Sequence, residues 1–304
     1  MILLKRRLKR IFTGKALYLT RCEEGEGKQM NQAAKAYKLR QDVVDIIVSG
    51  GGGHIGGDMS SMEIMMTLYH RMNVDPKNPD DPNRDRFVLS KGHCVETLYA
   101  VLADRGFLDI NEVKSEFSKF GSEYIGHPHN TLPGIEMNSG SLGHGLSVCV
   151  GMALAGRMDQ RPYRVYTLMG DGELAEGSIW EALMAAGHYK LDNLCAVVDR
   201  NHLQISGNTE NVMGHHDLHG RFAAFDWHVI DVADGNDIDQ LNAAFDEAEQ
   251  TKGQPTMIIA NTVKGMGSAI MENKAGWHHH LPNAEEYAQI KADLAARKEA
   301  LLHE

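Results

Sequence analysis

The chain has 304 residues, of which 42% are hydrophobic and 24% are charged, the ordinary balance of a globular protein with a substantial core. No apolar run approaches the roughly 20 residues that span a bilayer, which argues against an integral membrane protein. The formal net charge of −10 argues against nucleic acid as the main partner.

The first thirty residues differ from the rest of the chain. A basic run over residues 5–10 is followed by an acidic segment, broken by glycines, over residues 23–27. Charges interrupt the apolar stretch too often for a secretory signal. We therefore expect residues 1–30 to be a disordered N-terminal extension, or the product of a translation start upstream of Met30, with a targeting presequence as the remaining alternative. Residues 31–304 are expected to form one domain.

From Met30 onward, short apolar runs alternate with stretches of helical periodicity. Strands are expected over residues 87–89, 165–169, 194–198, 228–232 and 256–260. Helices are expected over residues 32–49, 60–72, 94–105, 144–158, 176–190, 237–251 and 284–302. In the second of these helices, Ser60 and Glu63 have the spacing of a capping box. The alternation predicts an α/β fold with a doubly wound, mostly parallel sheet and helices on both faces.

The four cysteines are widely spaced. Cys22, Cys94, Cys149 and Cys195 form no C-x-x-C pair, so neither a disulfide framework nor a cysteine-based zinc site is expected. This pattern favours a reducing compartment, and we expect the protein to be cytoplasmic.

The segment Gly51–Gly56 matches the dinucleotide-binding pattern G-x-G-x-x-G. The match is weak, because consecutive glycines satisfy many patterns and the preceding residues fit a helix better than a strand. The glycines are better explained as a loop that brings the backbone and His54 close to a ligand.

The strongest site signal follows two predicted strands. Asp171 stands between two glycines directly after the run 165–169, and Asn201 follows the run 194–198. Ligands of doubly wound sheets bind at the carboxyl ends of the strands, so both side chains are expected at that edge. A carboxylate and an amide oxygen are suitable ligands for Mg²⁺, and the helix expected to begin near Glu176 could bind phosphate at its N-terminus.

A Gly-Asp-Gly motif followed after about thirty residues by Asn resembles the diphosphate-binding motif of thiamine diphosphate enzymes. The wider chain, from about residue 35 to 282, resembles the N-terminal segment of transketolase. The motifs that carry the resemblance are, in order, Gly53–Gly56, Ser90–Cys94, Gly126–Pro128, Leu132–Glu136, Ser139–Gly145, Gly170–Gly177, Asn201 with Leu203, and Lys264–Gly267 leading to Trp277 and His278.

The resemblance implies a set of cofactor and metal ligands. Asp171, Asn201 and the backbone carbonyl of Leu203 would hold Mg²⁺, or Ca²⁺, which bridges the diphosphate of thiamine diphosphate. The residues implied to bind the cofactor are His54, His93, Gly140, Leu142, Gly170, Gly172, Glu173, Asn201 and His278. Of these, Gly172 would donate its amide to a phosphate oxygen, and Gly140 and Leu142 would pack beside the cofactor.

The resemblance also implies catalytic histidines. Transfer of a ketol unit requires proton transfers near neutral pH, which histidine side chains can perform. His54, His93, His127 and His278 match the active-site histidines of the family by their flanking residues. Because residues 278–280 are all histidine, either His278 or His279 could be the residue that the family uses.

Two further groups of polar residues have less certain roles. The resemblance implies that Glu176 and Glu181 form a catalytic acidic relay at a subunit interface; the alternative is two solvated carboxylates in the first turn of a helix. His215, His216 and His219 have a zinc-like spacing without supporting ligands, and a solvated loop is expected there.

The resemblance covers only the diphosphate half of a transketolase site. The family's pyrimidine-binding half, with its activating glutamate, lies beyond the matched segment. We therefore expect the N-terminal subunit of a split transketolase that acts on sugar phosphates, with a separate C-terminal subunit, in a heterotetramer of two copies of each. Ile55 and His144 depart from the family's usual Pro and Gln, so the donor sugar is expected to be an unusual one.

Other functions remain open at this point. The chain could belong to another thiamine diphosphate enzyme, such as a deoxyxylulose-phosphate synthase or a 2-oxo acid dehydrogenase. It could also be a cofactor-binding subunit without catalytic activity. The motifs around His93 and His127 favour transketolase over the dehydrogenase.

Overall fold

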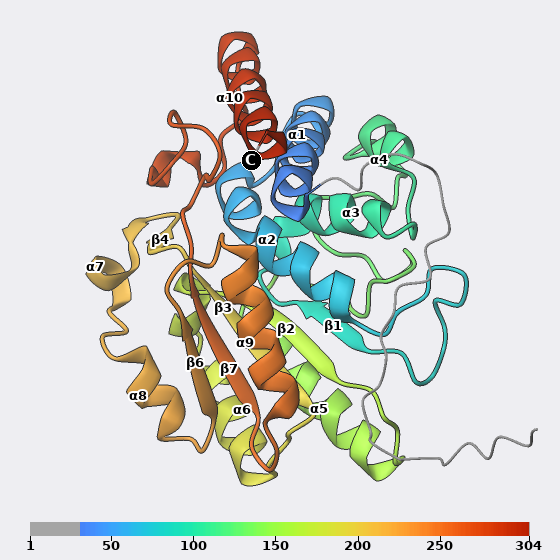
Figure 1. The fold of residues 1–304 in the computed structure, drawn as a ribbon, viewed down its shortest axis with the longest axis vertical. Helices are drawn as coiled ribbons and strands as arrows, with labels where there is room; N and C mark the ends of the chain where they lie inside the picture. Colours follow the sequence, from blue (N-terminus) through green and yellow to red (C-terminus); the bar gives the residue numbers. More distant parts are fainter. Residues whose placement is uncertain (1–30, 304) are drawn as a thin grey trace, which may run out of the picture.

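The structure, a computed structural model, describes residues 31–303, so the N-terminal extension predicted for residues 1–30 lies outside the described residues. At its centre is a five-stranded parallel sheet with the strand order β1-β2-β3-β7-β6 (Figure 1). Its strands are β1 (Arg86–Leu89), β2 (Val165–Gly170), β3 (Leu194–Arg200), β6 (His228–Val232) and β7 (Thr256–Asn261). The predicted fold class is confirmed, and all five predicted strands agree with these bounds to within two residues.

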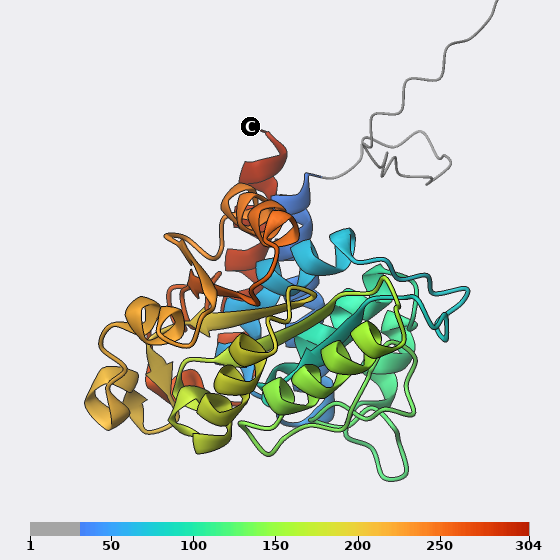
Figure 2. The same ribbon diagram turned by 90° about the horizontal axis from the view of Figure 1, so that it is seen from below.

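Helices cover both faces of the sheet (Figure 2). One face packs against α1 (Gln32–Gly50), α2 (Ile55–Arg71), α3 (Val95–Asp104) and α9 (Ile238–Gln250), and α10 (Ala284–Leu302) lies against α1. The other face packs against α5 (Gly145–Met158), α6 (Gly177–His188) and α8 (Leu218–Ala223). Successive side chains of a strand point to opposite faces of the sheet, so neighbouring residues pack into different hydrophobic cores. Leu168 and Met169 of β2 are an example. This double burial explains why the strands are continuously apolar in sequence.

The predicted start of the second helix is wrong. The helix α2 begins at Ile55 and His54 is its N-cap, so Ser60 and Glu63 lie inside the helix and form no capping box. Both side chains are buried and bind tertiary partners instead: the Ser60 hydroxyl donates to Asp199 Oδ2 at 2.7 Å, and Glu63 pairs with Arg40. Buried polar residues that serve tertiary contacts can have the same spacing as a cap, and the pattern alone does not distinguish them.

Several short elements were not predicted. They are α4 (Ile110–Glu116), α7 (Thr209–Met213), α8 (Leu218–Ala223) and the antiparallel pair β4 (Leu203–Gln204) and β5 (Gly207–Asn208). The helices α4 and α7 start at Asp109 and Asn208, whose side chains accept backbone N–H groups at 2.8 and 3.0 Å. Helices of five to seven residues are too short to show a helical period, so only their caps mark them in the sequence.

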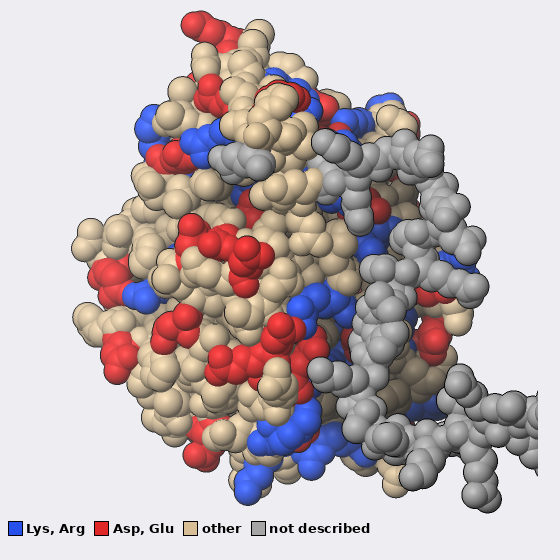
Figure 3. All heavy atoms as spheres, in the orientation of Figure 1, with Lys and Arg blue, Asp and Glu red and all other residues tan. Residues whose placement is uncertain are grey.

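The surface carries a strongly acidic region over α9, visible on the face shown in Figure 3. The exposed acidic side chains of this helix are Asp239, Asp246, Glu247 and Glu249. Such a face repels polyanions. Within residues 31–303, no helix combines the length and the apolar character needed to cross a membrane.

We expect the buried pair between Arg40 and Glu63 to be a main stabilising contact between α1 and α2. The guanidinium binds both carboxylate oxygens at 2.5 and 2.6 Å and also donates to the Met59 carbonyl oxygen. The substitution Glu63→Ala leaves a buried, unpaired cation, so the free energy of unfolding should fall by about 3–5 kcal/mol. Urea denaturation of the full chain measures this loss. Glu299→Ala, at an exposed pair, is the matched control, and an equally small change in both variants would contradict the expectation.

Candidate functional site

The loops that follow β1, β2, β3 and β7 meet at the carboxyl edge of the sheet and surround a cavity of about 400 Å³. The residues lining this cleft are His54, Lys91, His93, His127, Gly140, Leu142, Gly170, Asp171, Gly172, Glu173, Ala175, Glu176, Asn201, Leu203, Gln204, Ile205, Lys264 and His278. All the residues predicted for cofactor, metal or catalytic roles line it except Glu181. Its position is the one expected for a ligand site in a doubly wound sheet.

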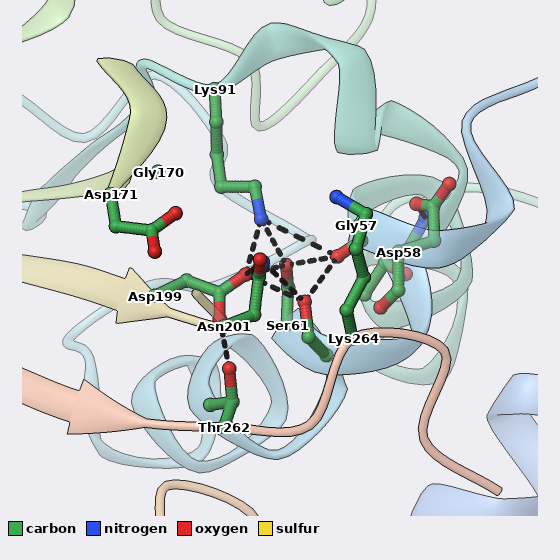
Figure 4. Close-up of polar contacts among 12 residues, drawn as sticks. Gly57, Asp58, Ser61, Lys91, Gly170, Asp171, Asp199, Asn201, Thr262 and Lys264 are labelled. Carbon is green, nitrogen blue, oxygen red and sulfur yellow. Dashed lines mark hydrogen bonds and ion pairs between the residues drawn. The ribbon is translucent and has the colours of Figure 1, made fainter. Parts of the chain in front are cut away.

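A buried ion pair lies at the base of the cleft (Figure 4). The ammonium of Lys91, from the loop after β1, binds the carboxylate of Asp199, the sixth residue of β3, and also donates to Ser61 Oγ at 3.0 Å. The Asp199 carboxylate accepts further hydrogen bonds from Ser60, Asn201 and Thr262. Burial alone would raise the pKa of Asp199, but Lys91 and these donors hold it below its usual range.

The Gly-Asp-Gly loop and the loop after β3 are joined through Asp171. One carboxylate oxygen accepts the Gly172 amide at 2.9 Å and the other accepts the His202 amide at 2.7 Å. Asn201 lies beside them, with its Oδ1 accepting the Leu203 amide at 3.1 Å. Burial, with the nearby Asp199 charge, raises the pKa of Asp171 to about 6. A divalent cation would relieve this cost by neutralising the buried carboxylate.

The oxygens of Asp171, Asn201 and the Leu203 carbonyl fit a hard cation such as Mg²⁺ in their chemistry: one carboxylate, one amide and one backbone carbonyl. Within residues 31–303, no group of three His, Cys, Asp or Glu side chains is arranged to hold a metal ion. The predicted ligand set is of a different kind, because two of its three oxygens are neutral. The Leu203 carbonyl now accepts a hydrogen bond from Lys264 Nζ at 3.1 Å.

Histidine rings gather at the mouth of the cleft around His54. The centroid of its ring lies 5.2 Å from that of His93, 6.0 Å from that of His127 and 5.7 Å from that of His278. The ring of His279 is nearer still, at 4.6 Å, although His279 is exposed and does not line the cleft. The structure therefore brings both candidates of the histidine triplet next to His54, with His278 in the cleft and His279 at its rim.

The histidines of the cleft are kept neutral. Burial lowers the pKa of His54 to about 4, with smaller effects from His279, His127 and Lys264. Burial and the charge of Lys264 lower the pKa of His278 to about 3. The pKa values of His93 and His127 are also lowered, chiefly by burial. Near neutral pH, each ring can therefore accept one proton or hydrogen bond.

The tautomer of His278 follows from its contact with Lys264. The Lys264 ammonium lies 3.0 Å from His278 Nδ1. An ammonium has only hydrogen-bond donors, so Nδ1 must be the acceptor and Nε2 carries the ring proton. In His54, by contrast, the buried Nδ1 has no hydrogen-bond partner in the described part of the chain. A buried polar atom without a partner beside a cavity is suited to contact with a ligand.

The remaining predicted cofactor residues shape the walls. Gly140 has φ +147°, and a side chain there would collide with the His127 ring, which explains the need for glycine. The Glu173 carboxylate is buried and accepts hydrogen bonds from Ser90 and from the Gly143 and Gly170 amides, the latter two at 2.9 and 3.0 Å. Glu173 thus ties together three of the loops that form the cleft.

The remaining residues named in the sequence analysis lie in different environments. Glu176 lines the cleft as the N-cap of α6, whereas Glu181 is exposed on that helix outside the cleft. The solvated loop expected for His215, His216 and His219 is wrong for His215, which is buried with Nε2 2.8 Å from the Asp171 carbonyl oxygen, and for His219, which lies in the helix α8.

The two departures from the family pattern also lie outside the cleft. Ile55 is buried in the core, and His144 is exposed at the N-cap of α5. The inference from these two residues to an unusual donor sugar therefore has no support in their positions. The helix expected to begin near Glu176 is confirmed as α6, which begins at Gly177 after a 3-10 turn over Gly172–Ala175.

Three charged residues of the site lie in or beside the sequence motifs but were assigned no role from the sequence. They are Lys91, Asp199 and Lys264, of which the first two form the central ion pair. A signal was available, because lysine and aspartate at strand ends in apolar surroundings are seldom buried without partners. Pairing Lys91 with Asp199 needs the three-dimensional neighbourhood of β1 and β3, which are separated by β2 in the sheet.

Comparison with known proteins places the chain beside one family. The family model described as "Transketolase, thiamine diphosphate binding domain" matches residues 31–301. A subunit of the apulose-4-phosphate transketolase of Phocaeicola vulgatus is 47% identical over 265 residues, which is 87% of this chain and 94% of that protein. A 6-deoxy-6-sulfo-D-fructose transketolase subunit from a Clostridium species is 40% identical over 88% of this chain and 97% of its own length.

Solved structures show the same relationship at the level of the fold. The transketolase of Leishmania mexicana superposes with a TM-score of 0.80 and 32% identity, covering 90% of this chain and 45% of that one. The transketolase of Campylobacter jejuni superposes with a TM-score of 0.82 at 29% identity, and the match covers 90% of this chain and 46% of that one. The chain thus spans slightly less than half the length of these transketolases.

The neutral His54 should leave a pH signature in the stability of the chain. In the unfolded chain a histidine titrates near 6.5, and burial lowers the pKa of His54 to about 4, so the unfolded state binds the proton more tightly. The stability that the neutral His54 ring contributes is fully present above pH 6.5 and is lost as the pH falls towards 4. Over this window the folding equilibrium constant should fall by at most about tenfold per pH unit. Urea denaturation should show a flatter profile over this window for His54→Asn. The exposed His188→Asn is the control, and identical profiles for both variants would refute the expectation.

Proposed function

Since the chain belongs to the transketolase family through its thiamine diphosphate-binding domain, we propose that it is the diphosphate-binding subunit of a two-subunit transketolase. In this role it transfers a two-carbon ketol unit from a ketose phosphate to an aldose phosphate. The observation that carries the proposal is the convergence of Asp171, Asn201, Leu203 and the histidines on one cleft at the carboxyl edge of the sheet. Residues 31–304 are proposed as the cofactor-binding domain.

The proposed cofactors are thiamine diphosphate and Mg²⁺. When bound, thiamine diphosphate supplies the carbon nucleophile that takes up the two-carbon unit. Asp171, Asn201 and the Leu203 carbonyl would hold Mg²⁺, and the diphosphate would lie against Gly170 and Gly172. Lys264 would supply positive charge: burial and the neighbouring Lys91 lower its pKa to about 8, and an anion beside it would favour the charged form.

The histidines are proposed to handle protons on the substrate. The lowered pKa values keep these rings neutral near pH 7, so they can accept hydrogen bonds from sugar hydroxyls, and an anionic ligand beside them would raise their pKa towards the range in which imidazole exchanges protons. Lys264 fixes the His278 ring with its Nε2–H available as a donor. His54 has a free acceptor or donor at Nδ1, while His93 and His127 lie on the neighbouring walls.

A second, separate chain is proposed to complete the site. The relatives from Phocaeicola vulgatus and Clostridium are themselves named as subunits of transketolases. We propose a heterotetramer with two copies of each subunit, in which Glu176 and Glu181 lie at an interface and act as an acidic relay.

The substrates are proposed by class. The named relatives act on apulose 4-phosphate and on 6-deoxy-6-sulfo-D-fructose, two sugars with different anionic groups. We propose an anionic ketose as the donor and a phosphorylated aldose as the acceptor, in a reducing, cytoplasmic compartment. Buried thiols at Cys94, Cys149 and Cys195 are compatible with that compartment.

The two-subunit proposal predicts that activity requires reconstitution. The chain should be mixed with the partner subunit encoded by an adjacent reading frame, thiamine diphosphate and Mg²⁺, and tested with a panel of ketose phosphates and ribose 5-phosphate. Ketol transfer is expected only in the mixture, because a cofactor bound by one half of its site is not activated. Full transfer by the purified chain alone would contradict the need for a second subunit.

Removing the proposed metal ligand should weaken cofactor binding. In Asp171→Ala, the only carboxylate of the proposed ligand set is lost, and the affinity of the reconstituted assembly for thiamine diphosphate with Mg²⁺ should fall at least about 100-fold, or 2.7 kcal/mol. Isothermal titration calorimetry measures this change. Asp239→Ala, on the exposed face of α9, provides the control. Unchanged affinity in Asp171→Ala would remove the basis for the metal assignment.

A further inference from the structure

Two buried carboxyl groups outside the described machinery face each other behind the histidine cluster. Asp58 lies in the first turn of α2 and Glu96 in the first turn of α3, and neither side chain is exposed to solvent. Their side chains are within hydrogen-bonding reach of each other. Neither residue was singled out from the sequence, and neither lines the cleft.

The hydrogen bonds around this pair do not satisfy two carboxylate ions. Asp58 Oδ1 accepts the Thr97 amide at 2.8 Å, but Asp58 Oδ2 and both oxygens of Glu96 have no donor with hydrogen-bond geometry in the described part of the chain, although the backbone amides of His54 and Glu96 lie near the Glu96 carboxylate. Two adjacent carboxylates without donors would repel each other in an apolar surrounding and lose their hydration. A single proton held between them removes one charge and supplies the missing donor.

The surroundings determine which residue keeps the proton. The Asp58 carboxylate accepts a hydrogen bond from the Thr97 amide, and the positive charge of Lys91 favours its ionised form. Asp58 therefore keeps the negative charge more readily than Glu96 does. Burial raises the pKa of both carboxyl groups, that of Asp58 to about 7 and that of Glu96 well above its usual range, where the Asp58 charge adds to the effect. The other ionisable groups facing the pair are Cys94 and Tyr99, whose pKa values are raised by burial, so both stay neutral. Lys91 is already paired with Asp199 and cannot neutralise two more charges.

The pair joins the two helix starts that carry cleft histidines. His54 is the N-cap of α2, four residues before Asp58, and His93 comes three residues before Glu96. The Asp58 carboxylate accepts the Thr97 amide in the first turn of α3, and the Thr97 hydroxyl donates to the Asp58 carbonyl oxygen at 3.0 Å. The Glu96 carboxyl group packs against Gly53. A Cβ atom added at position 53 would overlap Glu96 Oε1, so glycine is the residue that fits at this position.

We propose that Asp58 and Glu96 share one proton and that this carboxyl–carboxylate pair is a positioning device, which holds the starts of α2 and α3 together and so fixes His54 and His93 in the cleft. Glu96 is the proton donor and Asp58 the acceptor. Loss of the proton at alkaline pH places two negative charges side by side and separates the helix starts. The shared proton stands on this chain alone, whereas its value for catalysis rests on the proposed function.

The first test needs no activity. When folding raises the pKa of a group, that group stabilises the folded protein fully at pH values below its pKa in the unfolded chain, which is near 4.5 for Glu. This stabilisation is lost as the pH rises through the pKa of the group in the folded protein. The folding equilibrium constant of the full chain, from urea denaturation between pH 5 and 8, should therefore fall with pH more steeply than in Glu96→Gln, by up to about tenfold per pH unit. The exposed Glu299→Gln is the control and should follow the unmodified chain. Equal slopes in Glu96→Gln and the unmodified chain would overturn the shared proton.

Infrared spectroscopy provides a second measurement that does not depend on denaturation. At pH 7 the unmodified chain should show the carbonyl absorption of a protonated carboxylic acid, and this band should be absent from Glu96→Gln and present in Glu299→Gln. Because glutamine keeps the size of the side chain and an N–H donor for Asp58, this variant is expected to fold. Absence of the band in the unmodified chain would also overturn the proposal.

The positioning role is tested in the reconstituted two-subunit enzyme. Glu96→Gln should retain kcat to within about threefold and lose the alkaline decline of the unmodified enzyme, because the amide still donates to Asp58. Glu96→Leu removes the donor and should lower kcat at least about tenfold. Equal kcat values for the two variants would refute positioning. If no ketol transfer is seen with any chain, the proposed function fails, while the stability and infrared results still decide the shared proton.

Discussion

The buried pair between Lys91 and Asp199 is the interaction on which the architecture of the cleft depends. It joins the loop after β1 to the end of β3 across the intervening strand, and its hydrogen bonds reach Ser60 and Ser61 on α2, Thr262 after β7, and Asn201. Burying these charges costs desolvation energy, so the pair contributes little net stability and would be strongly destabilising if broken. Its value lies in geometry: it fixes the loops that carry Asp171, Asn201 and the histidines in one arrangement.

The same low-polarity surroundings give the cleft its acid–base character. Burial lowers the pKa values of the histidines and raises those of Asp171 and Glu96, in each case because it disfavours the charged form. Cations from Lys91 and Lys264 reinforce the effect on the histidines. The outcome is a set of neutral rings close to the ammonium of Lys264. Such a set is suited to an anionic ligand and to proton exchange with hydroxyl groups.

The errors of the sequence analysis share one physical cause. Ser60 and Glu63 looked like a capping box because the pattern records spacing and not burial, and both side chains are engaged by partners far along the chain. His215 looked like part of a solvated loop, yet it is buried against the Asp171 carbonyl. Asp58 and Glu96 gave no signal at all, since they are 38 residues apart and become neighbours only when α2 packs on α3.

The sequence by itself determined the fold class, the five strands and the ordered motifs, because doubly buried strands and the loops at their ends leave local patterns. It also indicated most of the residues that line the cleft. Only the tertiary structure decided which charges pair, which histidines are buried and neutral, and where Glu181 and His144 lie relative to the cleft. Pairing, burial and the resulting pKa shifts depend on distances between segments far apart in the chain, and no local pattern of residues encodes those distances.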